Sequence, residues 1–199
     1  MTRSKNNPIN APQAEAPNRL KDLFEAISKQ RYPPVHLWEP DLCGEIDMRI
    51  KSDGTWHYMG TPINRPEMVR LFSSVLRHDD DGTYLVTPAE KLKITVEDAP
   101  FLAISVDVER EGDEQLLVFE THVGDRVIAD DEHPIWMSAD KDGHKRPYIL
   151  VRNRLEALIA RPVYYELVDF AEALTIDGKE MLGLWSRGSF FVLDEMTRD

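Results

Sequence analysis

Residues 46–76 constrain the fold of this chain more than any other stretch, because they predict a β-hairpin that leads directly into an amphipathic helix. From Ile46 to Lys51, apolar and charged side chains alternate, which is the two-residue period of a strand with one buried face. Asp53-Gly54 supplies residues that tolerate positive φ, as a tight hairpin turn requires. Trp56 and Tyr58 then begin the returning strand. The chain is therefore expected to combine β and α structure in a small unit.

The helix of this stretch has a recognisable start. Asn64 can act as the N-cap, Pro66 lies where its missing N–H costs nothing, and Glu67 completes a capping box. The residues from Met68 to Leu76 carry one apolar face. The sequence predicts a helix that is capped by Asn64 and packs on the hairpin.

Part of this pattern recurs in the second half. Asn153-Arg154-Leu155-Glu156 repeats the Asn-Arg-x-Glu start, and the apolar pairs from Val163 to Ala171 recur every three to four residues. These features predict a second helix that begins at Asn153 and continues, kinked, beyond Arg161-Pro162. A repeated order of elements indicates duplication.

The remaining patterns divide the chain into a tail and two units. Residues 1–17 lack apolar content and are expected to form a disordered tail, whereas apolar residues at helical spacing predict a short helix from Asn18 to the prolines at 33–34. Strands are predicted at residues 84–87, 91–97, 101–108, 116–121, 125–129, 148–151, 181–186 and 189–193. The fold class we expect is α+β, with two related small units at 18–98 and 99–199, each a mostly antiparallel sheet with a packing helix.

Composition excludes several kinds of partner. The chain has 199 residues and a formal net charge of −12, which opposes binding to nucleic acid or to an anionic membrane surface. No apolar stretch follows Arg3 and Lys5, and the run from Ala99 to Ile104 is too short to span a bilayer. Cys43 is the only cysteine, so an intrachain disulfide is excluded. We expect a protein of the reducing cytoplasm without a signal peptide.

Four strings resemble a bacterial family known as domain of unknown function 1285. They are CGEIDMRIKSDGTWHYMGTPINRPEMVRLF, YLVTPAEKLKITVEDAPF, LEALIARPVYYELV and GLWSRGSFF, and the resemblance covers about residues 35–195. It implies a duplicated α+β core with a second domain like pleckstrin-homology folds. It also implies a pocket between the domains for a nucleotide-like ligand, and a role in signal transduction.

Arginines supply one ingredient of such a site. Between His144 and Tyr165 the basic residues outnumber the single acid, Glu156, in an otherwise acidic chain. Guanidinium groups match phosphate oxygens with paired hydrogen bonds. Arg65, Arg152 and Arg154 are therefore candidate ligand-binding residues, and the alternative is that they pair with the surplus carboxylates.

Aromatic side chains supply the second ingredient, a surface on which a base can stack. Trp56, Tyr58 and Trp185 are the candidates, and Arg187 follows Trp185 in the turn-like string Trp-Ser-Arg-Gly. The alternative for each aromatic residue is a place in the core.

Catalytic and metal sites find less support. Cys43 could be a nucleophile, but a lone cysteine is more often a small apolar residue. His122, His133 and His144 lie near carboxylates without an established metal-ligand spacing, and no catalytic motif is present. We therefore expect no catalytic residue, no metal and no cofactor. The favoured function is a non-catalytic cytoplasmic regulatory protein that senses a small anionic, nucleotide-like ligand. The alternatives are an enzyme for a small phosphorylated or acidic substrate, and a module that binds a protein partner.

Overall fold

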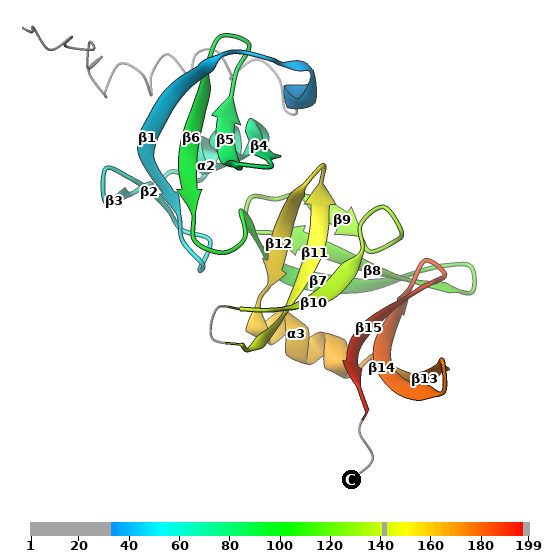
Figure 1. The fold of residues 1–199 in the computed structure, drawn as a ribbon. Helices are drawn as coiled ribbons and strands as arrows, with labels where there is room; N and C mark the ends of the chain where they lie inside the picture. Colours follow the sequence, from blue (N-terminus) through cyan, green and yellow to red (C-terminus); the bar gives the residue numbers. More distant parts are fainter. Residues whose placement is uncertain (1–32, 141–142, 197–199) are drawn as a thin grey trace, which may run out of the picture.

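The computed structural model describes residues 33–140 and 143–196. In this part the chain forms two six-stranded sheets, one three-stranded sheet and two α-helices (Figure 1). The expected tail at residues 1–17 and the helix predicted from Asn18 lie outside the described residues. No helix in the described part is long and apolar enough to cross a membrane.

The first sheet follows the order β3-β2-β1-β6-β5-β4. Its unit contains η1 (Val35–Leu37), β1 (Leu42–Ile50), β2 (Trp56–Tyr58), β3 (Thr61–Pro62), α2 (Pro66–Ser74), β4 (Leu76–Asp79), β5 (Gly82–Val86) and β6 (Lys91–Val96). The predicted hairpin is confirmed, because β1 pairs antiparallel with β2. The turn between them depends on Asp53, whose Oδ1 accepts hydrogen bonds from the N–H and the hydroxyl of Thr55, and on Gly54 at φ 82°. On its other side β1 pairs in parallel with β6.

Helix α2 begins one residue later than predicted, because its N-cap is Arg65 and not Asn64. Its N-cap is Arg65, whose side chain makes no capping hydrogen bond, so the predicted capping box of Asn64 and Glu67 is wrong. The reason is Pro66, since a residue that precedes proline is pushed out of the helical region into extended backbone. Arg65 accordingly has φ −103° and ψ 106°.

The second sheet repeats this strand order within its own unit. The unit contains β7 (Phe101–Glu111), β8 (Glu114–Thr121), β9 (Arg126–Ile128), β10 (Ile135–Ala139), β11 (Lys145–Arg152), β12 (Leu155–Ile159) and α3 (Arg161–Val168). The order is β10-β11-β12-β7-β8-β9, with β7 and β12 parallel and the other neighbours antiparallel. In both sheets the first and sixth strands therefore pair in parallel at the centre.

The second helix does not begin where the sequence predicts. Asn153 has φ 51° and stands in the turn between β11 and β12, and residues 155–159 form a strand. The prediction failed because asparagine is favoured both as a helix cap and in left-handed turn positions. The helical prediction beyond Arg161-Pro162 is confirmed by α3, which starts afresh with Pro162 in its first turn.

The chain ends in a three-stranded sheet of β13 (Glu172–Ile176), β14 (Lys179–Ser186) and β15 (Ser189–Glu195). Ser186 attaches it to the second sheet: its buried hydroxyl donates to the carbonyl of Ala129 at 2.6 Å and accepts from the N–H of Leu117 at 2.9 Å. Gly183 is required for close packing, because a Cβ there would stand 2.5 Å from both the Phe190 ring and the Phe191 carbonyl oxygen.

One cluster of buried apolar residues runs through both units. Trp56 and Phe72 from the first unit, with ring centroids 6.4 Å apart, belong to the same cluster as Phe101 and Phe119 from the second. The units are thus joined by shared hydrophobic burial as well as by chain connectivity.

Candidate binding site between the two units

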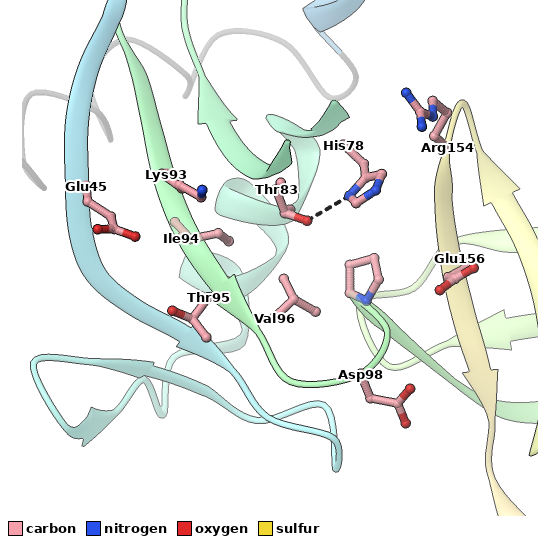
Figure 2. A pocket seen from close by; sticks show the side chains of 12 residues that line it. Glu45, His78, Thr83, Lys93, Ile94, Thr95, Val96, Asp98, Arg154 and Glu156 are labelled. Atoms are coloured by element: carbon pink, nitrogen blue, oxygen red, sulfur yellow. Dashed lines mark hydrogen bonds between the residues drawn. The ribbon is translucent and has the colours of Figure 1, made fainter. Parts of the chain in front are cut away.

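Two cavities open at the junction of the units, with volumes of about 600 and 480 Å³. The larger cavity is lined by residues of β1, β4, β5 and β6 on the first unit. On the other side it is lined by residues 98–100, the β11–β12 turn and β12 (Figure 2). The smaller cavity lies next to it, and His78 and Arg154 line both.

The wall from the first unit presents Lys93. Along β6 the buried residues Leu92 and Ile94 alternate with Lys93, so the lysine points away from the core. The aliphatic part of the Lys93 side chain passes close to β5, because a Cβ on Gly82 would lie 3.0 Å from the Lys93 Cε. Within the described residues, no hydrogen bond or ion pair engages the Lys93 ammonium group. The same wall holds His78, whose Nδ1 shares a 2.9 Å hydrogen bond with the Thr83 hydroxyl (Figure 2).

The wall from the second unit presents Glu156. Its neighbours on β12, Leu155 and Ala157, are buried in the core, so the strand period turns Glu156 to the opposite face. Burial raises the pKa of this carboxyl above its usual value of 4.5, and the charge of Asp98 adds to the effect. In the part of the chain that the structure describes, its carboxylate has no hydrogen bond or ion pair.

Unlike Glu156, the Asp98 carboxylate in the same wall has hydrogen-bond partners on both of its oxygens. Arg146 donates to its Oδ2 at 2.5 Å, and the hydroxyl of Tyr148 donates to its Oδ1 at 2.8 Å. Burial and this hydrogen bond raise the pKa of Tyr148 to about 12. The ion pair leaves Asp98 little capacity to bind a further cation.

Arg154 reaches across the junction from the β11–β12 turn. Its Nη1 lies 2.7 Å from Oδ1 of Asp80 on the first unit, in a solvent-exposed pair. Exposed pairs of this kind contribute well under 1 kcal/mol. The guanidinium is therefore available to a ligand at little cost.

Of the seven residues that the sequence proposed, Arg154 lines the two cavities. Trp56 is 2% exposed and stacks on Phe72 in the core. Arg152 pairs with Asp125 and donates to the backbone carbonyl of Ser73.

The other four lie elsewhere and line neither cavity. Arg65 is exposed at the start of α2, and Tyr58 lies on β2. Trp185 and Arg187 belong to the third sheet, where Trp185 packs on Phe190 and Arg187 pairs with Asp130. The structure thus does not bring the seven together.

Sequence reasoning missed Lys93, His78 and Glu156. Strand alternation could have placed Lys93 and Glu156 on outward faces. Glu156 was instead assigned to a helix start, and nothing local indicates that two strands so distant in the chain face each other.

The residues considered for chemistry do not gather into a reactive site. Cys43 donates a weak hydrogen bond to the carbonyl of Asp41 and lines neither cavity. Within residues 33–140 and 143–196, no group of three or more His, Cys, Asp or Glu side chains is placed to hold a metal ion.

Comparisons with known proteins identify the two units. Residues 33–99 match the model described as domain of unknown function (DUF1285), N-terminal domain, and residues 100–193 match its C-terminal domain. A DUF1285 family protein from Silicibacter pomeroyi DSS-3, whose crystal structure has 2.50 Å resolution, is 52% identical. The match has a TM-score of 0.81 and covers 88% of this chain and 94% of that one. A DUF1285 family protein from Shewanella baltica OS155, with a structure at 1.40 Å, is 31% identical over 61% of this chain and 90% of that one, with a TM-score of 0.48. No curated protein matches the chain.

Proposed function

The chain belongs to the DUF1285 family, and from this premise we propose that it is a cytoplasmic, non-catalytic ligand sensor with a regulatory role in signal transduction. Its ligand is a small nucleotide-like anion bound in the larger cavity between the two units. The observation that carries the proposal is Lys93, whose ammonium group makes no hydrogen bond or ion pair in the described residues, at the wall of a cavity that both units build.

The volume of the cavity and the presence of Lys93 and Arg154 in its lining support this ligand class. Sites for small molecules usually have volumes of about 300–1,000 Å³, and this cavity has about 600 Å³. Figure 2 shows Lys93 on β6 and Arg154 on the β11–β12 turn at opposite sides of the cavity, so a ligand that spans the cavity could meet a cation from each unit. Because charge-assisted hydrogen bonds to phosphate are strong, a ligand that contacts both units would hold them together.

Thermal unfolding against a panel of mono-, di- and cyclic nucleotides tests the proposal. A ligand that binds the folded state alone, at a hundred times its Kd, adds about 2.7 kcal/mol, which corresponds to a Tm shift of several degrees. Lys93→Met is expected to reduce the shift, whereas Lys179→Met is expected to leave it unchanged. Lys179 pairs with Glu195 on the third sheet and makes a matched control. The absence of any shift at millimolar nucleotide would refute the proposal.

We also propose that the two units arose by duplication. Support comes from the identical strand order of the two sheets, with the first and sixth strands parallel at the centre of each. The helices differ in place, since α2 follows the third strand and α3 follows the sixth. A superposition of residues 42–96 on 101–159 in which the corresponding strands do not overlie would contradict duplication.

The proposal that the second unit is like pleckstrin-homology folds rests on the family resemblance. It is supported by α3, which follows the six strands and buries Val163 and Leu167 in the core. A structural comparison in which α3 and the sheet cannot be matched together to such a domain would contradict it.

A further inference from the structure

The larger cavity contains an acidic group that a purely anionic ligand would leave unsatisfied. Glu156 faces it from β12 with no partner in the described chain, while the nearby Asp98 is held by Arg146 and Tyr148. A half-buried carboxylate without hydrogen-bond donors loses hydration and gains nothing in return. A ligand that occupies the cavity must either supply donors to Glu156 or worsen this cost.

Lys93 presents the complementary situation on the opposite wall. Figure 2 shows its ammonium group on the β6 side and the Glu156 carboxylate on the β12 side of the same space. In the part of the chain that the structure describes, neither group makes a hydrogen bond or an ion pair, although the charge of Lys93 helps to lower the pKa of the Asp81 carboxyl. The cavity thus has Lys93 on one wall and Glu156 on the facing wall, while Glu45 adds a second acidic side chain on β1.

We propose that the ligand carries, apart from its anionic group, a planar group with two adjacent N–H donors, as at the Watson–Crick edge of guanine, and that Glu156 binds this edge. This inference rests on the proposed function and names the base of the nucleotide. Lys93, on the wall opposite Glu156, then binds the phosphate.

The chemistry of the bases decides the choice. An ionised carboxylate only accepts hydrogen bonds, and its two oxygens match two parallel donors. Guanine offers N1–H and the 2-amino group side by side. Adenine and cytosine offer one amino donor beside a ring-nitrogen acceptor, and uracil offers one N–H between two carbonyl oxygens. Each of these other edges places at least one acceptor against the carboxylate.

The raised pKa of Glu156 agrees with this assignment. Burial and the charge of Asp98 disfavour the ionised form when the cavity is empty. Two donated hydrogen bonds favour the ionised form, so a guanine edge would relieve the cost.

Calorimetric titration of GMP, AMP and UMP into the full chain tests the inference, because the three share ribose and phosphate. A correctly read base edge is worth about 10- to 100-fold in affinity, so GMP should bind tighter than AMP and UMP by that factor. Glu156→Gln should remove the preference and leave the Kd for AMP within about twofold. Lys93→Met should weaken all three nucleotides by the same factor. Glu120→Gln, at an exposed position on β8, is the matched control and should behave as the unchanged protein.

The outcomes separate this inference from the function on which it rests. Equal affinity for the three nucleotides, or a GMP preference that survives Glu156→Gln, overturns the assignment of guanine and leaves the proposed function standing. No binding of any nucleotide overturns both.

Discussion

Arg152 on β11 donates a hydrogen bond to the backbone carbonyl of Ser73 at the end of α2, with 2.8 Å between Nη2 and the oxygen. Its Nη1 pairs with the carboxylate of Asp125, and its guanidinium carbon lies 4.7 Å from the centre of the Phe101 ring. One side chain therefore connects the helix of the first unit to a loop and a strand of the second. The sequence suggested Arg152 as a ligand-binding residue, and the structure places it in the contact between the units.

Arg152→Met is expected to lower the free energy of unfolding by about 3 kcal/mol, because the mostly buried Asp125 carboxylate loses its guanidinium. Urea denaturation followed by tryptophan fluorescence measures the change. Arg154→Met is the matched control, since the pair of Arg154 with Asp80 is 58% and 94% exposed and should contribute less than about 1 kcal/mol. Equal losses for the two variants would show that Arg152 does not support the contact between the units.

Ser186→Ala is expected to destabilise the protein by about 2 kcal/mol. The change removes the hydroxyl that serves both the Ala129 carbonyl and the Leu117 N–H, and both of these groups belong to residues that are fully buried. Ser189 is its cross-strand neighbour and bonds Asp131 on the surface, so Ser189→Ala should change stability by no more than about 0.5 kcal/mol. Thermal unfolding of the two variants measures the difference, and similar Tm values would contradict the role given to Ser186.

His122 should make stability depend on pH. Burial lowers its pKa below the usual 6.5, although the backbone of Leu102 and Gly54 and the charge of Asp125 partly oppose this. The unfolded chain then binds a proton that the folded chain does not, so stability is complete above pH 6.5 and is lost as the pH falls toward the folded pKa.

The slope of stability between pH 6.5 and 5 tests this prediction. His122→Asn keeps an acceptor near the Leu102 N–H and should reduce the slope, even if it lowers stability at every pH. His144→Asn is the control, because that side chain is 79% exposed, and it should leave the slope unchanged. An unchanged slope in His122→Asn would mean that another group causes the pH dependence.

Glu156→Gln should stabilise the protein at pH 7 and not at pH 4. The pKa of Glu156 is higher in the folded chain than in the unfolded chain, so stability falls as the pH rises from about 4.5 through the folded pKa. The neutral amide escapes this penalty. After allowance for solvent screening at a half-buried site, the gain at pH 7 is a few tenths of a kcal/mol. A loss of stability at pH 7 would indicate that the carboxylate has a stabilising partner in solution.

The local part of the fold could be predicted. Alternation along residues 46–51 and the Asp53-Gly54 turn predicted the first hairpin, because both signals arise from neighbouring residues. Periodicity likewise indicated β7, β8 and the last hairpin. The predicted capping box was wrong because Pro66 forces Arg65 into extended backbone. The capping-box pattern considers only residue types at fixed spacing and does not account for this effect.

The candidate site could be predicted only in part. Arg154 was proposed from the local excess of arginines, and it does line the cavities, although in a β-turn and not at a helix start. Trp56 was proposed as a base-stacking residue because it is aromatic and lies on a predicted strand, but it is buried in the core. Residue type alone does not distinguish an aromatic ring at a binding surface from one that packs inside.

By itself, the sequence determined the elements whose signals are local: the alternating strands, the tight turns and the presence of a helix after the first hairpin. Only the tertiary structure decided that β1 pairs with β6 and β7 with β12, and that Lys93 and Glu156 face one cavity. The physical reason is that parallel pairing and contact between the units depend on the burial of faces from distant parts of the chain. The sequence of each strand alone does not indicate which distant strand it will pair with or face.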